Sequence, residues 1–294
     1  MGEITKHPHY VYRKYLRAWA NKEMIFCLRE KKNIFKTNIM NVGQENYFYE
    51  FKLCTDKEIE LAKYFAEKTC DSLMYVYEKM NNALKKTYNL SDSIRKNEII
   101  EFVKQCEEKH FNCVVEDRLK PMLNALYKED FTFLENESDS MQFFHAISEQ
   151  YCRTKKIKEN TQKIYSNFGD PDIRGENIWI LIRHSIALKI GLSLFQEKYR
   201  VCLLKSENSN FITSDQPVIN FHSDFDGIPI EFELYYPISP SLAIMISKQE
   251  KYPDKKIITI DGEEVIKWND LIAKLSHSQI YSHKRELLEK YLIK

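Results

Sequence analysis

The fold is decided by one stretch, Phe211-Ile212-Thr213-Ser214-Asp215-Gln216-Pro217-Val218-Ile219. Two more apolar runs follow it, Leu234-Tyr235-Tyr236-Pro237-Ile238-Ser239-Pro240 and Leu242-Ala243-Ile244-Met245-Ile246. Short β-branched and aromatic runs that are cut by Ser, Asp and Pro predict strands of a sheet. Because proline cannot donate a ladder hydrogen bond, we expect Pro217 and Pro237 at strand ends, edges or bulges. The Ser214-Asp215 pair would then be a polar site held at the mouth of a rigid sheet.

Working outward, alternating patterns extend this sheet on both sides. A small N-terminal hairpin is predicted from Met24–Leu28 and Asn33–Phe35 around a charged tip, and Asp261-Gly262 is predicted to be a tight turn. The other strand candidates are Tyr199–Leu204, Val218–Phe221, Ile230–Leu234, Lys256–Ile260 and Gln279–Tyr281.

The middle of the chain has helical spacing instead. Thr55-Asp56-Lys57-Glu58 forms a capping box that starts a long helix, and Asp170-Pro171 is predicted to cap a central, buried helix. Pro121 predicts a kink or a helix start. The further helices are expected in residues 7–20, from Ser91 or Ser93, across Val115–Leu126, and at Ser140–Arg153, Lys156–Asn167, Val265–Leu275 and Lys284–Leu292.

These patterns predict an α+β fold, in which a helical middle packs on a mixed or antiparallel sheet. The N-terminal hairpin and the C-terminal strands would join in that sheet. We expect a single domain over residues 1–294, mainly helical at about 55–196 and sheet-forming at about 197–294.

Composition narrows the class of protein. With 43% hydrophobic and 13% aromatic residues the chain is not disordered, and its 294 residues can bury a core. The net charge of +1 provides no global field for nucleic acid, so such a partner would need a local basic patch. The seven scattered cysteines indicate a reducing compartment, and no apolar run is long enough to span a membrane. A cytoplasmic protein is expected.

The familiar catalytic motifs are missing. There is no Gly-rich phosphate loop, no His-Glu-x-x-His and no Gly-x-Ser-x-Gly. Glu107-Glu108-Lys109 lies in a helical pattern and is a poor nuclease signature, and Arg183-His184 lacks the spacing of a ribonuclease pair.

Several polar residues remain as candidates, each with a structural alternative. His9 could carry a proton, although a histidine at a helix start is more often only polar surface. Gln150 and Arg153 share a helical face, but Arg153 projects away from the apolar side and favours a surface ion pair with Glu149. The basic run Arg153–Lys158 could contact phosphate, but such runs are usually solvated.

The acidic candidates have structural alternatives too. Glu116 could simply pair with Lys120, one helical turn on. Asp215 could cap turn amides or serve as a strand-end carboxylate of a metal or acid–base site. Ser239 is expected to stabilise a turn.

Taken in order, these pieces resemble a bacterial family known only as domain-of-unknown-function family 4238. The resemblance rests on His9-Tyr10-Val11-Tyr12-Arg13-Lys14-Tyr15-Leu16, Gln150-Tyr151-Cys152-Arg153-Thr154, Ser214-Asp215-Gln216-Pro217-Val218 and Pro237-Ile238-Ser239-Pro240. Tyr12 stands where the family has proline. Glu116 and Asn269 match the family's glutamate and asparagine that precede helices.

The resemblance adds functional weight to His9, Glu116, Gln150, Arg153, Ser214, Asp215 and Asn269, and implies one composite site. Family members are associated with mobile or defence islands, so the resemblance implies a nuclease-like effector that hydrolyses phosphodiesters. In that hypothesis Asp215 and Glu116 hold a divalent metal or act as base, His9 transfers the proton, and Arg153 stabilises phosphate charge. Gln150, Ser214 and Asn269 would bind the substrate. The alternatives are a module that binds a nucleotide or small molecule without turnover, and residues that only pin the helices to the sheet.

Overall fold

The computed structural model describes residues 8–46, 48–49, 54–67, 113–167, 169–223 and 231–293. The helix expected from Ser91 or Ser93 lies outside these residues, as do Glu107-Glu108-Lys109 and the predicted continuation of the helix that starts at Thr55.

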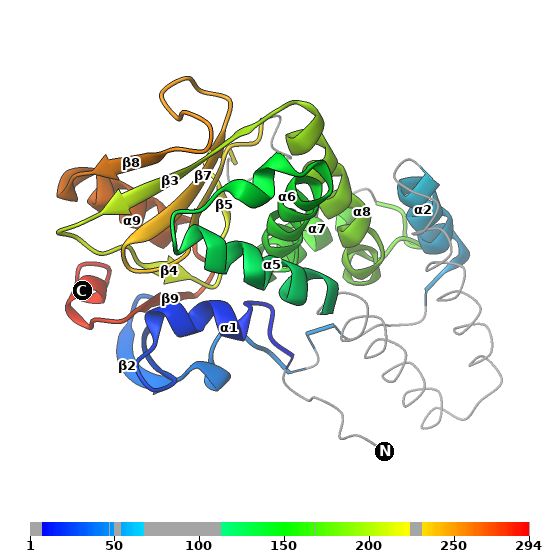
Figure 1. The fold of residues 1–294 in the computed structure, drawn as a ribbon. Coiled ribbons are helices and arrows are strands. Elements are labelled where there is room, and N and C mark those ends of the chain that lie inside the picture. The colour runs from blue at the N-terminus through cyan, green and yellow to red at the C-terminus, as the bar shows by residue number, and fades with distance from the viewer. Residues whose placement is uncertain are drawn as a thin grey trace, which may run out of the picture.

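The described part of the chain alternates helices with short strands (Figure 1). Its helices are α1 (Arg13–Leu16), α2 (Asp56–Glu67), α5 (Cys113–Leu126), α6 (Glu137–Cys152), α7 (Lys155–Ser166), α8 (Gly175–Gln196), α9 (Gly262–Leu275) and α10 (Glu286–Glu289), with 3-10 turns η1 (Arg17–Trp19), η2 (Ile39–Asn41) and η4 (Thr132–Glu135). Its strands are β1 (Met24–Arg29), β2 (Asn33–Asn38), β3 (Arg200–Ser206), β4 (Thr213–Ser214), β5 (Ile219–Asn220), β6 (Leu234–Pro237), β7 (Leu242–Ser247), β8 (Ile257–Ile260) and β9 (Gln279–Ser282). The α+β prediction is confirmed.

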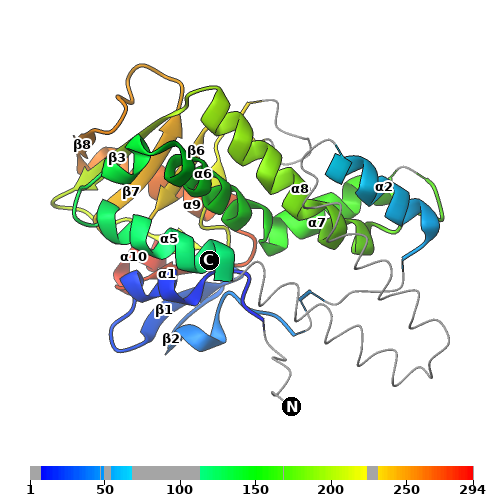
Figure 2. The same ribbon diagram turned by 45° about the vertical axis from the view of Figure 1, so that its right-hand side comes forward.

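Within the described residues the strands form two sheets rather than one. The first has the order β2-β1-β9-β4 and the second β5-β6-β7-β3-β8, in which β3 and β8 are parallel. The predicted N-terminal hairpin is confirmed, with Cys27 opposite Phe35. It joins the C-terminal strands only through β9, because β9 pairs with β1 on one side and with β4 on the other. The helical middle lies to one side of both sheets (Figures 1 and 2).

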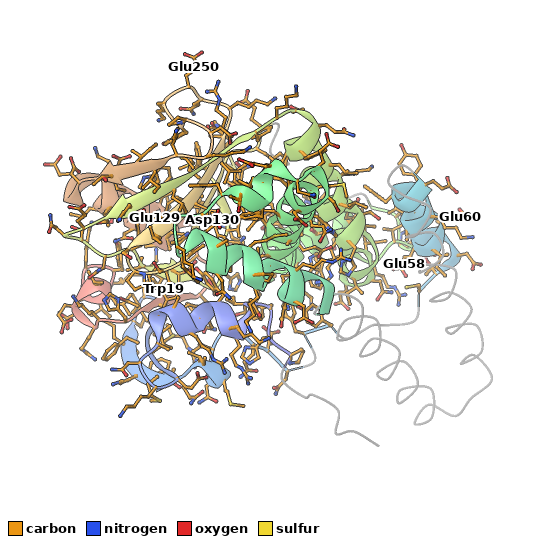
Figure 3. The ribbon with its side chains drawn as sticks, in the orientation of Figure 1. Trp19, Glu58, Glu60, Glu129, Asp130 and Glu250 are labelled. Carbon is orange, nitrogen blue, oxygen red and sulfur yellow. The ribbon has the colours of Figure 1, made fainter. Side chains whose placement is uncertain are left out.

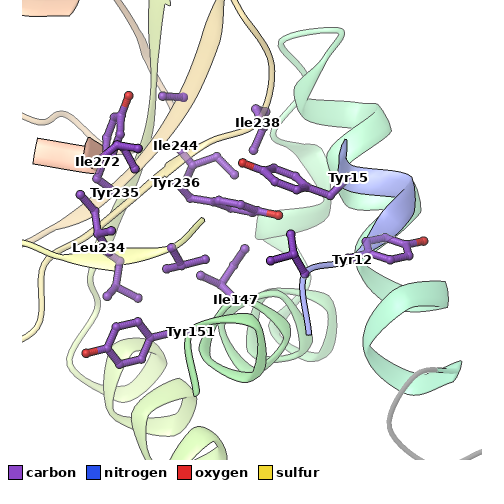
Figure 4. Packing of buried hydrophobic residues seen from close by; sticks show 14 of the residues in the cluster. Tyr12, Tyr15, Ile147, Tyr151, Leu234, Tyr235, Tyr236, Ile238, Ile244 and Ile272 are labelled. Atoms are coloured by element: carbon purple, nitrogen blue, oxygen red, sulfur yellow. The ribbon is translucent and has the colours of Figure 1, made fainter. Parts of the chain in front are cut away.

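Tyr15 sits where the two sheets meet. Its hydroxyl lies 2.5 Å from the Thr213 hydroxyl in the first sheet and donates to the Pro237 carbonyl in the second at 2.6 Å. Its ring stacks on Tyr236, with centroids 5.0 Å apart, above Ile147 and Tyr151 of α6 (Figure 4). Because all of these side chains are buried, one apolar core spans the hairpin, the helices and the second sheet.

Pro217 and Pro237 lie at positions where the sheet requires no backbone N–H donor. Pro217 falls in the link between β4 and β5, and Pro237 is the last residue of β6, as expected. Pro121 lies inside α5, so it does not start that helix. Ser239 stabilises its turn by accepting the Leu242 amide hydrogen at 3.0 Å.

The capping box at α2 is confirmed, and it also docks the helix. Thr55 and Glu58 exchange side-chain to backbone hydrogen bonds at 2.8 and 3.1 Å. The Glu58 carboxylate is fully buried and accepts hydrogen bonds from Arg174 and Asn177 at the start of α8. Figure 3 shows Glu58 directed at the body of the protein and Glu60 directed away from it.

One predicted helix cap, one predicted turn and one predicted helix length differ from the structure. Asp170 does not cap α8, because its carboxylate accepts the Asp172 amide hydrogen in a local turn and the helix begins only after Arg174. Asp261-Gly262 is not a hairpin turn, because the Asp261 side chain accepts the Glu264 amide hydrogen and caps α9. The helix expected at Lys284–Leu292 is limited to the short α10.

Neither sulfur bridges nor membrane spans occur in the described residues. Cys27, Cys54, Cys152 and Cys202 are buried free thiols. None of the helices in this part of the chain has the length and apolarity needed to cross a bilayer.

Candidate functional site

Arg153 occupies the C-cap of α6 and is only 5% exposed. Its guanidinium donates to the His9 carbonyl at 2.8 Å and lies 3.9 Å from a Glu116 carboxylate oxygen. The predicted surface ion pair with Glu149 is wrong, because the last turns of α6 are buried on every side and both Glu149 and Arg153 lie inside the protein. Glu149 bonds His184 instead.

Gln150 supports the same contact one turn earlier. Its amide donates to the Tyr10 carbonyl at 3.2 Å and its side chain is buried. Consecutive carbonyls of the N-terminal segment are therefore held by side chains from the last turn of α6. The Gln-x-x-Arg spacing therefore places both side chains on one side of α6, where they hold the N-terminal segment.

His9 lies beside these groups in a positive environment. It forms an isolated antiparallel bridge with Gln44. Burial, with the nearby charges of Arg13 and Arg153, lowers the pKa of His9 to about 4, against an opposing contribution from the Val42 backbone. The imidazole is therefore neutral at physiological pH, and its reactive nitrogen is a base rather than an acid.

Glu116 enters the cluster from the first turn of α5, where its side chain is 24% exposed. Burial raises the pKa of the Glu116 carboxyl, although Arg153, Lys14 and Arg13 act in the opposite direction. The structure pairs it with Arg153 at a distance longer than a hydrogen bond, so this carboxyl is only loosely neutralised. Tyr12 packs against α5, with its hydroxyl directed at that helix (Figure 4). We call His9, Gln44, Tyr12, Glu116, Gln150 and Arg153 the Arg153 cluster.

Asp215 holds the backbone together instead of facing an open site. Its carboxylate is 1% exposed and accepts hydrogen bonds from the amides of His277, Ser278 and Gln279 at 2.8–2.9 Å. Burial raises the pKa of this carboxyl, and the same amides act to lower it. With both oxygens occupied in this way, Asp215 anchors the segment that leads into β9.

Two other predicted site residues make similar local contacts. The Ser214 hydroxyl donates to the Gln216 carbonyl at 3.0 Å and accepts the Gln216 amide hydrogen. Asn269 of α9 accepts the Ile212 amide hydrogen and donates to the Asn210 carbonyl, both at 2.9 Å. Together they fix the path of the chain into and out of β4.

The seven predicted residues thus fall into two groups. His9, Glu116, Gln150 and Arg153 come together, whereas Ser214, Asp215 and Asn269 surround β4. The two groups are linked because the hydroxyl of Thr154, the residue after Arg153, donates to the Gln216 side chain. Among the described residues, no group of three or more His, Cys, Asp or Glu side chains could hold a metal ion.

The basic run after Arg153 is less solvated than expected. Lys156 donates to the Leu275 carbonyl at 2.7 Å, and Lys158 donates to the Phe48 carbonyl and lies 4.4 Å from the Phe48 ring centroid. Burial lowers the pKa of each of these lysines to about 8. The run therefore docks α7 with its positive charge facing the protein.

Sequence reasoning missed a buried network behind Arg153. His184 lies 2.8 Å from Glu149 through Nδ1 and 2.9 Å from Arg183 through Nε2. Since a guanidinium can only donate, Nε2 is the acceptor and Nδ1 carries the proton that bonds Glu149. Arg183 also covers the rings of Tyr49 and Trp179, 4.8 and 5.0 Å from their centroids. The only sequence signal was the adjacent Arg183-His184 pair.

A second missed group lies at the end of the second sheet. The Glu233 carboxylate lies 2.6 Å from the His222 imidazole and accepts hydrogen bonds from Ser247 and Gln249. No spacing in the sequence indicated this group, because its members come from three separate strand ends.

Comparison with known proteins identifies the family of the chain. No curated protein and no solved structure matches the chain. The family described as "Protein of unknown function (DUF4238)" matches residues 7–286, which include both groups of predicted site residues. The chain therefore belongs to the DUF4238 family.

Proposed function

We propose that the Arg153 cluster binds the phosphate of a nucleotide or of a nucleic-acid end. The observation that carries this proposal is the buried Arg153 guanidinium, which is 5% exposed, donates to the His9 carbonyl and lies 3.9 Å from the Glu116 carboxylate. A buried guanidinium beside a loosely paired carboxyl can bind a phosphate oxygen at little cost in reorganisation.

Glu116 would control access to this anion site. When it is ionised it attracts Arg153, and when it is protonated it leaves the guanidinium to the phosphate. Because the pKa of Glu116 is raised, this competition lessens as the pH falls through that raised value. Gln150 would keep the N-terminal segment against α6, so that His9 stays beside the ligand.

The test is thermal stabilisation by a panel of nucleotides. A ligand at 100 times its dissociation constant should stabilise the folded chain by about 2.7 kcal/mol. Arg153→Lys keeps the charge but loses the planar fork, so we expect at least roughly tenfold weaker binding. Arg17→Lys, at the exposed ion pair with Glu23, is the matched control and should bind like the wild type. Equal stabilisation of both variants contradicts the proposal.

Phosphodiester hydrolysis is the second candidate, favoured by the opposite pKa shifts of His9 and Glu116. A neutral imidazole can accept a proton from water as its oxygen attacks phosphorus. A protonated carboxyl can then give its proton to the leaving oxygen as the P–O bond breaks. Arg153 would stabilise the charge of the transition state.

This candidate predicts a bell-shaped pH profile on the acidic side of neutrality. Activity should rise as the pH passes about 4, where His9 loses its proton. It should fall as Glu116 ionises. Cleavage of DNA and RNA should be measured with Mg²⁺, with Mn²⁺ and with chelator. Glu116→Gln should abolish turnover without weakening binding. If no supplied substrate is cut under any of these conditions, the nucleotide-binding role stands alone.

The family resemblance leads us to extend this proposal to an effector role in bacterial defence. Expression of the wild-type chain should then slow bacterial growth or reduce phage plaques, whereas the Arg153→Lys chain should do neither. The same effect from both chains at equal protein level would argue against a role for this site.

A further inference from the structure

Positive charge is concentrated in the segment that forms α1 and the N-terminal hairpin. Eight basic residues and two acidic ones lie between Arg13 and Lys36, whereas the whole chain has 44 and 43. The remainder of the chain is therefore net negative, and the near-neutral total conceals a strongly basic region. Because salt screens exposed charges beyond about 10 Å at 0.1 M ionic strength, a ligand at this surface experiences the local charge and not the total.

The two glutamates of this segment neutralise only two of its cations. Glu23 lies 2.8 Å from Arg17, and Glu30 lies 3.8 Å from Lys32. Within the described part of the chain, no carboxylate pairs with the other six cations, and each of them is exposed or partly exposed. We call these six residues the basic N-terminal surface: Arg13, Lys14, Lys22, Arg29, Lys31 and Lys36.

The cations are spread along the hairpin instead of converging at one point. Lys22 precedes β1 at the base of the hairpin, and Lys31 lies at its tip, beyond the pair of Arg29 with Asn33. Strands of this length span roughly 20 Å. Figure 1 shows α1 and β2 together at one side of the molecule, below α5. A mononucleotide is too small to contact all of these charges, whereas a long polyanion can contact several of them at once.

The aromatic side chains of this region favour a duplex over a single strand. The Lys36 ammonium lies 5.5 Å from the Phe26 ring centroid, and the Arg29 guanidinium lies 5.1 Å from that of Phe35. Among the described residues 8–46, every aromatic side chain is buried or half-buried. Binders of single strands use open aromatic faces on which unpaired bases stack. In a duplex the bases are already stacked, so cations that contact the backbone phosphates are sufficient.

The hairpin also carries positive charge on both of its faces. Lys36 is the cross-strand partner of Phe26, three positions from Arg29, so Lys36 and Arg29 project to opposite faces. A duplex groove is walled by a phosphate backbone on either side, so both faces can contact phosphates there. We propose that the basic N-terminal surface binds the phosphate backbone of double-stranded nucleic acid.

This surface is continuous in sequence with the segment that Arg153 holds. Arg13 begins α1, shortly after His9, whose carbonyl accepts a hydrogen bond from the Arg153 guanidinium. A duplex on the hairpin can therefore end near the Arg153 cluster. Only this orientation of the duplex rests on the proposed function, since Arg153 would hold its terminal phosphate.

The experiment is titration of the full-length chain with a fluorescent DNA duplex of about 20 base pairs, in chelator, at KCl concentrations from about 50 to 200 mM. The test variant carries Lys22→Gln, Lys31→Gln and Lys36→Gln. Each lost phosphate contact should lower the slope of log affinity against log salt by about 0.9. Over this range the wild type should therefore lose roughly 40-fold more affinity than the variant.

The matched control carries Lys198→Gln, Lys256→Gln and Lys267→Gln. These three lysines are exposed after α8, before β8 and on α9, and their loss changes the net charge equally. The control should keep the wild-type slope, and melting curves of each chain should show that all of them fold. The same slope for the test variant and the wild type overturns the proposal. An equal decrease in both variants also overturns it, because net charge alone would then explain the binding.

Other ligands separate this surface from the Arg153 cluster. Nucleoside monophosphates that bind to a chain that does not bind the duplex overturn the duplex surface and leave the proposed function intact. Duplex binding that the lysine substitutions weaken, but that Arg153→Lys and removal of the terminal phosphate do not change, supports the surface and overturns the role of Arg153. Tighter binding to a single strand of equal length, or to phosphatidylserine vesicles, overturns the choice of a duplex.

Discussion

At the scale of single residues, the structure differs from expectation at Asp215 and Arg153. Asp215 makes structural contacts, and Arg153 is buried instead of exposed. A carboxylate at a strand end resembles a catalytic group, but three backbone amides use the Asp215 oxygens. Arg153 was assigned to the surface by helical geometry, yet it is buried, because the last turns of α6 are buried on every side. Neither outcome could be predicted from sequence, because each depends on a partner more than 60 residues away.

Asp215→Asn should destabilise the fold without removing ligand binding. The amide group of Asn would face backbone N–H donors, so we expect a loss of about 2–4 kcal/mol. The melting temperature should fall by roughly 5–15 °C. Asp270→Asn, which removes an exposed ion pair with Lys290, should cost at most about 1 kcal/mol. Loss of nucleotide binding by a folded Asp215→Asn chain would instead favour a functional carboxylate.

Glu116→Gln should tighten the binding of a dinucleoside monophosphate, whose single charge does not change between about pH 4 and 8. The wild-type chain should bind more tightly as the pH falls through the raised pKa of Glu116, and the variant should bind equally at all these pH values. Titration at several pH values measures this. A wild-type affinity that rises with pH would exclude the proposed competition for Arg153.

At the scale of secondary-structure elements, local sequence signals were reliable where backbone groups form hydrogen bonds with residues close by in the sequence. The Thr55–Glu58 box and the N-terminal hairpin were both predicted from neighbouring residues. The start of α8 was misplaced because Glu58 of a different helix accepts the Arg174 amide hydrogen, which moves the cap beyond Asp170. Tertiary contacts override propensity at such junctions.

Glu58→Gln should loosen α2 from α8 by about 1–3 kcal/mol. Burial alone would raise the pKa of Glu58, but hydrogen bonds from Arg174, Asn177 and Thr55 hold it below 4.5. A lowered carboxyl pKa gives stability that is present above 4.5 and lost as the pH falls through the folded value. The difference in urea midpoint between wild type and variant should therefore shrink at low pH. A difference that stays constant down to about pH 2 would contradict this.

At the scale of the whole molecule, the α+β class could be predicted from periodicity, but the division into two sheets could not. Strand pairing is a long-range choice, and nothing local indicates that β9 pairs with β1 while β8 pairs with β3. The convergence of His9, Glu116 and Arg153 was implied by family resemblance alone, since these residues share no sequence neighbourhood.

The single-domain expectation remains a prediction, and Tyr15 offers its test. If the sheets share one core, wild-type chain and Tyr15→Phe should each melt in one calorimetric transition, with the variant about 1–3 kcal/mol less stable. Two separate transitions in the wild type would indicate independent domains. Tyr64→Phe, at an exposed ring on α2, is the matched control.

The position of β9 has a consequence for synthesis in the cell. Of the described strands, β9 is synthesised last, yet it lies between β1, the first of them, and β4, and its approach is fixed by Asp215. A ribosome must therefore pass residue 282 before the N-terminal hairpin gains its neighbour. Until then, the hairpin edge stays open and prone to wrong pairing.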